Sequence, residues 1–338
     1  MGMGAMTLTK ASGIFILKNL IRMWLLLAAV SIAAFVLASA SPLDPLQTNV
    51  GQAAMGAMSQ EQIKKLETYW GTDEEPVQRY LHWAKDALHG DMGESLLYRR
   101  PVLEVIGQRL SNSLFVLLFA WVTAGILGVV LGMLAGIYRG SWLDKAVRGY
   151  ALLMASTPVF WLALLLLLIF AVWLKVLPIG FGVPIGVEAA DVTLQERITH
   201  AILPALTLSI TGISNITLHT REKMVEIMES EYMLFALARG EKKRERILRH
   251  GVRNMVLPAL TLQFASVGEI IGGSVLAEQV FSYPGLGQAA VTAGIGGDVP
   301  LLLGITVVTA AMVFLGNFVA DLLYGIVDPR IRERGMRP

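Results

Sequence analysis

The chain has 338 residues, of which 54% are hydrophobic and 16% are charged, and its mean hydropathy is +0.59. Soluble domains carry about 25% charged residues, so this composition argues against an ordinary water-soluble domain and indicates a protein that lies largely in lipid. The absence of cysteine excludes disulfides and thiolate chemistry, and the net charge of +2 becomes informative only when it is mapped along the chain.

Long apolar runs predict where the chain crosses a bilayer. Each run reaches the roughly 17–25 residues that a helix needs to cross about 30 Å of hydrocarbon. A large soluble protein with several buried helices is the alternative, but such helices usually carry a polar face. We therefore predict an all-α membrane protein with six transmembrane helices. The predicted spans are Met23–Pro42, Leu110–Tyr138, Gly149–Leu174, Ile198–Thr220, Met255–Phe281 and Val299–Ala320, of which only the fifth contains acidic residues, Glu269 and Glu278.

The distribution of basic residues predicts the orientation. With a cytoplasmic N-terminus, the segments on the inner side are 1–22, 139–148, 221–253 and 328–338, and they hold nineteen of the 28 Lys and Arg residues. Cytoplasmic loops carry an excess of Lys and Arg. We therefore expect both termini, 1–22 and 328–338, to be cytoplasmic tails.

The first predicted span, 23–42, permits two interpretations. Basic residues at Lys10, Lys18 and Arg22, an apolar run and the sequence "ASA" at Ala38–Ala40 also resemble a cleavable signal peptide. The apolar run is long for a signal peptide, which favours a transmembrane helix. Cleavage after Ala40 would leave the rest of the topology unchanged.

The segment 43–109 is predicted to be an external helical subdomain. The sequence "SQEQ" at Ser59–Gln62 has the spacing of a capping box. Pro76 suits the first turn of a second helix, and Gly90 suits its C-terminal stop. A solvated cap and a docking surface are both consistent with this composition.

Residues 110–327 are predicted to form a five-helix core. Gly128, Gly132 and Gly136 repeat every fourth residue, which places a flat groove on one face of the second span. Small residues at this spacing allow close helix packing in lipid. Pro158 is interpreted as a kink in the third span, and Pro178 with Pro184 as a turn.

The loop 221–254 carries the densest basic cluster of the chain, with seven Lys and Arg residues from Arg239 to Arg253. Tyr232, Phe235, Ala236 and Arg239 share one helical face, and Gly240 suits a left-handed helix stop. A solvated loop, an anchor for anionic lipid headgroups and a docking element for a partner are the possible interpretations. Nucleic-acid binding is disfavoured because no stacking aromatic lies among these bases.

These residues carry a family resemblance. Glu231, Ala236, Ala238, Gly240 and Ile247, followed by "RHGVRNMVLP", resemble the coupling loop of ABC importer permeases, and more narrowly of the dipeptide/oligopeptide/nickel branch. The "SPLDP" sequence at Ser41–Pro45 departs from that pattern, and the residues before Lys18 have no counterpart in it. Further matches in the same order are "GDMGES" (Gly90–Ser95), "RPVLEVIGQRL" (Arg100–Leu110), "RGSWLDKAVR" (Arg139–Arg148), "STPVFWLALLL" (Ser156–Leu166), "HAILPALTL" (His200–Leu208), "EQVFSYPGLGQ" (Glu278–Gln288), "DVPLLLG" (Asp298–Gly304) and "DLLYGIVDPRIR" (Asp321–Arg332).

The resemblance implies a subunit of an importer in the bacterial cytoplasmic membrane. Its implied partners are a second homologous permease subunit, two ATP-binding subunits, an extracytoplasmic substrate-binding protein and membrane lipid, with no nucleic acid. No P-loop motif occurs in the chain, so ATP and Mg²⁺ are expected on the partner subunits and no cofactor or catalytic residue in this chain. The residues implied to contact an ATP-binding subunit are Glu231, Tyr232, Ala236, Ala238, Arg239 and Gly240.

Glu269 is the predicted residue of the substrate pathway, because ionisable groups inside a membrane mark pathways or functional sites. Gly268, Gly272 and Gly273 would leave room beside it for cargo or for a partner helix. A structural glutamate bonded across a subunit interface is the alternative. The loop at Tyr283, Pro284 and Gly285 is predicted to line an external gate or to turn the chain.

Peptides are the predicted cargo, and nickel or another metal held in a small-molecule chelate is the alternative. His82 and His89 are seven residues apart, a poor spacing for one ion, and His200 and His219 are nineteen apart, so no metal site is predicted. A channel or scaffold that works without ATP is a more distant alternative, and no constellation typical of an enzyme is found.

Overall fold

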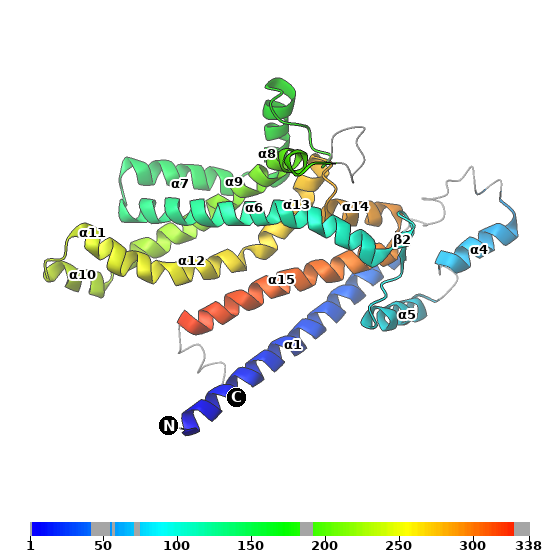
Figure 1. The fold of residues 1–338 in the computed structure, drawn as a ribbon, viewed down its shortest axis with the longest axis horizontal. Helices are drawn as coiled ribbons and strands as arrows, with labels where there is room; N and C mark the ends of the chain where they lie inside the picture. Colours follow the sequence, from blue (N-terminus) through cyan, green and yellow to red (C-terminus); the bar gives the residue numbers. More distant parts are fainter. Residues whose placement is uncertain (1, 42–54, 56–57, 71–74, 183–191, 328–338) are drawn as a thin grey trace. The chain divides into compact units, whose positions relative to one another are not determined.

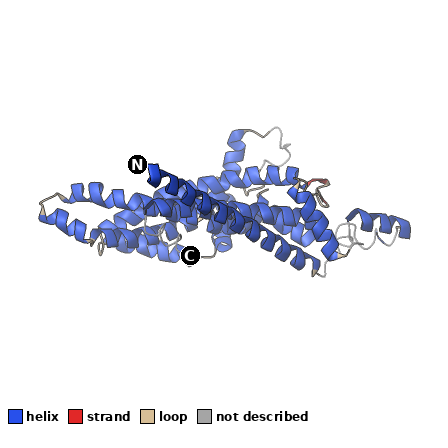
Figure 2. Cartoon of the chain, turned by 90° about the horizontal axis from the view of Figure 1, so that it is seen from below, coloured by secondary structure: helices blue, strands red, loops and turns tan. Residues whose placement is uncertain are grey.

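The computed structural model describes residues 2–41, 55, 58–70, 75–182 and 192–327, and most of these residues are helical (Figures 1 and 2). The predicted tail 328–338, Pro184 and all of "SPLDP" except its serine lie outside these ranges. The described ranges contain four helices that are long and apolar enough to cross a membrane, or up to six spans if each of two bent pairs is one span. The structure is therefore that of a mainly helical membrane protein, and the six-span layout stays a prediction.

The chain divides into two compact units, one of residues 1–113 with 284–312 and the other of residues 114–283 with 313–338. The segment 43–109, which we predicted to be a subdomain, falls within the first unit. That unit contains α1 (Gly2–Ser39), α4 (Gln60–Trp70), α5 (Pro76–Leu88), an antiparallel pair of short strands β1 (Glu94–Ser95) and β2 (Arg100–Pro101), the start of α6 (Val102–Ile137), α14 (Leu286–Gly296) and the start of α15 (Val299–Val327).

The helix signals of the first unit act as the sequence predicts. The Ser59 Oγ accepts a hydrogen bond from the Gln62 N–H at 3.3 Å, and the Gln62 side chain accepts one from the Ser59 N–H at 2.9 Å. This reciprocal pair is the predicted capping box. Pro76 opens α5, and Gly90 lies just past its end with φ +87°, a backbone conformation that strains other residues.

The core of the first unit joins the start of α6 to α14 and α15. A buried carboxylate organises the polar part of this junction: Asp298 is fully buried and accepts hydrogen bonds from Ser95 Oγ at 2.5 Å and from the Leu97 N–H at 3.1 Å. Its other oxygen accepts the Leu301 N–H at 3.2 Å, which caps α15. The apolar core residues are Val102, Val105, Ile106, Leu286, Ala289, Ala293, Leu301 and Ile305.

The second unit is built on α6 and α9. It contains the rest of α6, α7 (Trp142–Ala155), α8 (Val159–Leu166), the π-helical η1 (Leu167–Trp173), α9 (Leu194–Met228), α10 (Glu231–Ala238), α11 (Lys243–Arg246), the π-helical η2 (Ile247–Val252), α12 (Arg253–Ala265), α13 (Val267–Val280) and the end of α15.

The glycine face of α6 packs against α9, which confirms the predicted close packing. A Cβ built on Gly128 would lie 2.7 Å from the Ile216 Cβ, and one on Gly132 would lie 2.6 Å from the Thr220 Cβ. Gly136 meets the next turn of α9 in the same way. Real Cβ atoms do not approach so closely, so only glycine permits this helix separation.

The helices extend beyond the predicted spans, because charged residues end an apolar run without ending a helix. Helix α1 already begins at Gly2, α6 begins at Val102 and α9 continues to Met228. The third predicted span, Gly149–Leu174, contains the predicted bend at Pro158, where α7 and α8–η1 meet at 104°. The fifth predicted span is likewise bent, by 43°, where α12 meets α13.

Candidate functional site

Helix α10 is a short helix with well-defined ends, placed between α9 and α11. Past its C-terminus Gly240 adopts φ +80°. The Gly240 N–H bonds to the Leu237 carbonyl at 2.9 Å and the Glu241 N–H to the Ala236 carbonyl at 3.1 Å. These two bonds form a Schellman motif, so Gly240 is the helix stop that the sequence predicts.

The two faces of α10 differ sharply in burial. Met233 and Ala236 are 1% and 3% exposed and point into the chain's own core. Glu231, Ala238, Arg239 and Gly240 are exposed. Around the rest of the helix lie four exposed large apolar side chains, which we call the α10 apolar patch and which are each between 43% and 65% exposed: Tyr232, Leu234, Phe235 and Leu237.

The predicted helix is present, and five of the six residues predicted to contact an ATP-binding subunit are exposed on the isolated chain, whereas Ala236 is buried. Ala236 lies on the inner face, so the close approach that it allows is to this chain and not to a partner. Leu234 and Leu237 were not among the predicted contact residues. The signal that could have found them is that α10 is apolar on every side, although it lies between charged segments.

The inner face of α10 is anchored in a small core made of three longer helices. Met233 packs with Ile227 at the end of α9 and with Met255 and Ala259 on α12. Partly buried residues of α6 complete this core, among them Met133. Full burial of a methionine side chain is worth about 1.5–3 kcal/mol. This core therefore connects α10 to α9, α12 and α6.

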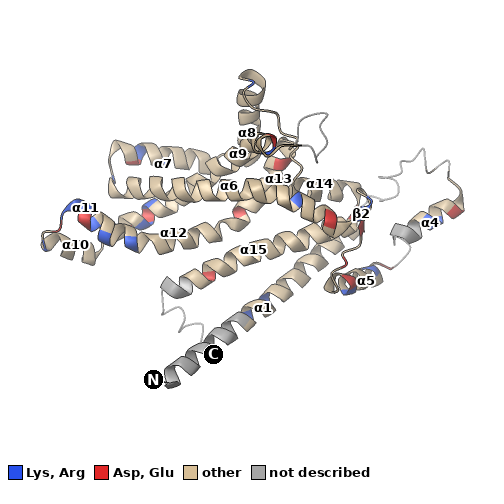
Figure 3. Ribbon diagram, viewed as in Figure 1, with Lys and Arg blue, Asp and Glu red and all other residues tan. Residues whose placement is uncertain are grey.

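The segment after α10 is basic and partly ordered by local contacts. Figure 3 shows Lys and Arg on α11 and at the start of α12. His250 on η2 lies 3.0 Å from the Glu241 carboxylate, and the Lys243 ammonium lies 4.7 Å from the centre of the Tyr138 ring. A shallow hollow of about 400 Å³ is lined by Lys242, Arg244, Glu245, Leu248 and Arg249.

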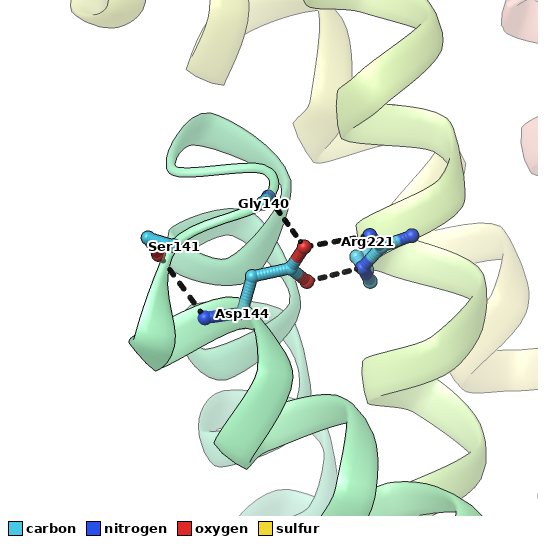
Figure 4. A network of polar contacts seen from close by, with 4 residues as sticks. All are labelled: Gly140, Ser141, Asp144 and Arg221. Atoms are coloured by element: carbon cyan, nitrogen blue, oxygen red, sulfur yellow. Dashed lines mark hydrogen bonds and ion pairs between the residues drawn. The ribbon is translucent and has the colours of Figure 1, made fainter.

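An ion pair joins α7 to α9 about two turns before the end of α9, which is followed by α10 (Figure 4). Arg221 donates from Nε to Asp144 Oδ1 at 2.6 Å and from a terminal nitrogen to Oδ2 at 2.8 Å. The Gly140 N–H also donates to Asp144 Oδ2 at 2.8 Å, and Ser141 Oγ caps α7 by accepting the Asp144 N–H. Both charged side chains are largely buried, with 5% of Asp144 and 18% of Arg221 exposed.

A second ion pair, at the surface, links the turn between α6 and α7 to the residue after α9. Arg139, in the turn after α6, pairs with Glu229, the residue that follows α9. Both side chains are more than half exposed. Exposed ion pairs contribute little stability, so the buried Asp144–Arg221 pair is the stronger connection between α7 and α9.

Glu269 lies in the first turn of α13 with an exposed side chain. Its carboxylate accepts a hydrogen bond from the Asn215 amide of α9. Gly272, one turn further along, faces open space, since a Cβ there would meet nothing within 4 Å. The structure therefore leaves Glu269 and Gly272 accessible on the isolated chain, as either a cargo pathway or a partner helix would require.

The other two glycines predicted beside Glu269 face the chain itself. A Cβ on Gly268 would lie 3.1 Å from Val313 Cγ1, and one on Gly273 would lie 3.3 Å from Leu208 Cδ2. These distances show that Gly268 and Gly273 allow α13 to pack closely on α15 and α9. The room that they leave is already filled by this chain.

The residues of the predicted external gate fall on both sides of the boundary between the two units. Tyr283 is buried, and its N–H bonds to the Glu278 carbonyl at 2.8 Å. Burial, with a smaller contribution from the charge of Glu278, raises the pKa of the Tyr283 phenol to about 12. In the first unit, the Pro284 carbonyl accepts the Asn112 amide at 2.9 Å and Gly285 precedes α14 in an extended conformation. The gate itself stays a prediction.

Among the described residues, no group of three or more His, Cys, Asp and Glu side chains is placed to hold a metal ion.

Comparison with known proteins gives consistent results over most of the chain. Residues 128–333 match the family described as binding-protein-dependent transport system inner membrane component. The chain is 32% identical over 309 residues to the oligopeptide transport system permease protein AppB of Bacillus subtilis, covering 90% of this chain and 95% of that protein. It is 30% identical over 338 residues to the dipeptide transport system permease protein DppB of Escherichia coli, covering 95% and 99% of the two chains. A putative peptide permease protein of Brucella suis is 33% identical over 308 residues, covering 91% of this chain and 95% of that protein.

Proposed function

Since the chain belongs to the family of binding-protein-dependent transport system inner membrane components, we propose that it is the membrane-spanning subunit of an ATP-driven peptide importer. In this proposal the chain pairs with a second permease subunit, and two ATP-binding subunits lie on the cytoplasmic side. A binding protein on the outer side delivers the cargo, and both termini of this chain are cytoplasmic. The relatives named for oligopeptide and dipeptide transport support peptides as the cargo.

The observation that carries the proposal is the α10 apolar patch. Four large apolar side chains on an eight-residue helix are exposed between charged segments. Large exposed apolar surface rimmed by polar residues marks interaction sites. Glu231 and Arg239 at the two ends of α10 can add charge-assisted hydrogen bonds. The patch therefore suits insertion into a groove on an ATP-binding subunit.

The contacts beneath α10 supply a route for coupling. Met233 ties α10 to α9 and α12, and Asp144 with Arg221 ties α9 to α7. Closure of the ATP-binding subunits would move α10, and these contacts would carry the movement into the membrane helices as a rigid-body shift. Access to the pathway would then alternate between the two sides of the membrane.

The coupling proposal is tested with Phe235→Asp. Phe235 is 65% exposed, so the substitution places a charge in the proposed interface without disturbing this chain's core. We expect loss of copurification with the ATP-binding subunits, or loss of the ATP hydrolysis stimulated by the binding protein. The matched control is Trp142→Asp, because Trp142 is an exposed aromatic residue at the start of α7, outside the patch. Normal assembly and stimulated hydrolysis in Phe235→Asp would contradict the proposal.

The proposed pathway residue is tested with Glu269→Gln. This variant keeps the hydrogen bond from Asn215 but removes the negative charge that would attract the amino terminus of a peptide. We expect reduced peptide uptake with unchanged amounts of assembled transporter. Chelated nickel, offered in parallel, tests the alternative cargo. Unchanged uptake of every cargo by the variant would exclude the Glu269 charge from transport.

A further inference from the structure

Helix α5 carries an apolar face that this chain does not cover. Val77, Leu81 and Leu88 are 68%, 59% and 71% exposed. On a helix with 3.6 residues per turn, these three side chains lie within about 40° of one another. Exposed apolar side chains that share one face of a helix indicate a surface that meets a partner or a membrane.

The arc of α5 beside this apolar face is polar, and a third arc packs against α1. Gln78, His82, Lys85 and Asp86 form the exposed polar arc next to the apolar face. Tyr80 faces α1: its ring lies 5.2 Å from that of Phe35. Helix α5 therefore has three adjoining arcs: one packs against α1, one is apolar and one is polar. Helices that lie in a membrane interface have this kind of pattern, with the polar arc facing water and the apolar arc facing lipid.

The contacts with α1 set the depth of α5 relative to the membrane span. The apolar span of α1 runs from Leu17 to Ser39. Ser31 Oγ already donates to the Ala28 carbonyl, so the Tyr80 hydroxyl, 2.8 Å away, donates to Ser31 Oγ. With a rise of about 1.5 Å per residue, Ser31 lies about 12 Å below the end of this span.

A second contact places α5 close to the end of the same span. Arg79 donates to Ser39 Oγ at 3.2 Å, and its guanidinium carbon lies 5.2 Å from the centre of the Phe35 ring. Phe35 is four residues, or about 6 Å, before Ser39. Interfacial helices bury their apolar face about 5–10 Å into the boundary between headgroups and acyl chains. The first turn of α5 is held within that layer by α1.

From these contacts we infer that α5 lies in the plane of the membrane interface at the end of α1, with Val77, Leu81 and Leu88 against lipid acyl chains. A fully solvated α5 would leave these three side chains in water. Tyr80 on the same helix, however, contacts Ser31, which lies well inside the apolar span of α1. Because α1 holds α5 at this level, the surface that borders the uncovered face is lipid. The inference does not depend on which side of the membrane the subdomain occupies.

The chain contains no cysteine, so single cysteines can be introduced and spin-labelled without changing other residues. The variants Leu81→Cys and Gln78→Cys place labels on the apolar and polar arcs at the same level of α5. The full-length chain, purified with the subunits that accompany it, is reconstituted into phosphatidylethanolamine–phosphatidylglycerol vesicles without a binding protein. The unsubstituted chain, taken through the same labelling, gives the background from accompanying subunits.

The measurement is the collisional accessibility of each label to oxygen, which concentrates in lipid, and to a water-soluble nickel chelate. We expect the oxygen-to-chelate ratio of the Leu81→Cys label to exceed that of the Gln78→Cys label several-fold, and the pair Leu88→Cys and Asp86→Cys to repeat the result. Equal access of the chelate to both arcs would overturn the inference in favour of a solvated helix. Shielding of the Leu81→Cys label from both reagents would overturn it in favour of a protein cover.

Discussion

The buried pair of Asp144 and Arg221 gives the sharpest prediction about the second unit. The variant Asp144→Asn keeps the size of the side chain but removes its charge. Arg221 would then keep its guanidinium charge at a site where 18% of the side chain is exposed, without the carboxylate that now accepts bonds at 2.6 and 2.8 Å.

The size of the expected effect follows from the cost of leaving a buried charge unpaired. Two unit charges about 4 Å apart attract by about 4 kcal/mol at an effective dielectric constant of 20. Removal of one partner of a buried pair typically costs 3–5 kcal/mol, because the remaining charge is uncompensated. The Gly140 N–H also loses its charged acceptor. We therefore expect Asp144→Asn to lower the free energy of unfolding by about 3–5 kcal/mol.

The assay is the free energy of unfolding of the purified chain in mixed micelles, measured by titration with sodium dodecyl sulfate. The matched control is Arg139→Gln, which breaks the nearby exposed pair with Glu229, between the turn before α7 and the end of α9, and should cost at most about 1 kcal/mol. The double variant Asp144→Asn/Arg221→Met removes the stranded charge and should recover part of the loss. Similar small effects for Asp144→Asn and Arg139→Gln would refute the reasoning.

Two further predictions concern close packing and buried polar contacts. Gly132→Ala forces a methyl group to within 2.6 Å of Thr220, so we expect a loss of about 1–3 kcal/mol in the same titration. Gly149→Ala is its control, because a Cβ at Gly149 meets nothing within 4 Å and alanine favours the helix. Ser95→Ala removes the donor at 2.5 Å from the buried Asp298 carboxylate and should cost about 1–3 kcal/mol, measured by thermal unfolding. A stable Gly132→Ala would contradict the tight α6–α9 contact, and an unchanged unfolding temperature of Ser95→Ala would contradict the importance of the Asp298 network.

Local signals in the sequence predicted local structure well. The spacing of Ser59 and Gln62 gave the capping box, and Gly240 gave the end of α10, because both signals act within a few residues. The repeat of Gly128 and Gly132 predicted a close helix contact but not its partner. Spacing describes a face of one helix, and only the fold identifies α9 as the helix against that face.

Longer-range features could not be predicted from the sequence. Asp298 receives its hydrogen bond from Ser95, more than 200 residues earlier, so no sequence window contains both groups. The face of α10 that turns inward is set by the packing of Met233 against Met255 on α12, and the sequence pattern of α10 does not contain that contact. The bend around Pro158 was predicted as a kink, but its size depends on where α8 packs in the second unit.

The central claim is that this chain carries cargo across the membrane under the control of subunits that bind α10. The most direct test is uptake of labelled dipeptides and longer peptides by cells that hold the complete neighbouring gene set, with this chain deleted and then restored as wild type, Phe235→Asp or Trp142→Asp. The account predicts that wild type and Trp142→Asp restore peptide uptake and that Phe235→Asp does not, although all three chains reach the membrane in similar amounts. Restoration of peptide uptake by Phe235→Asp at the wild-type rate would contradict it.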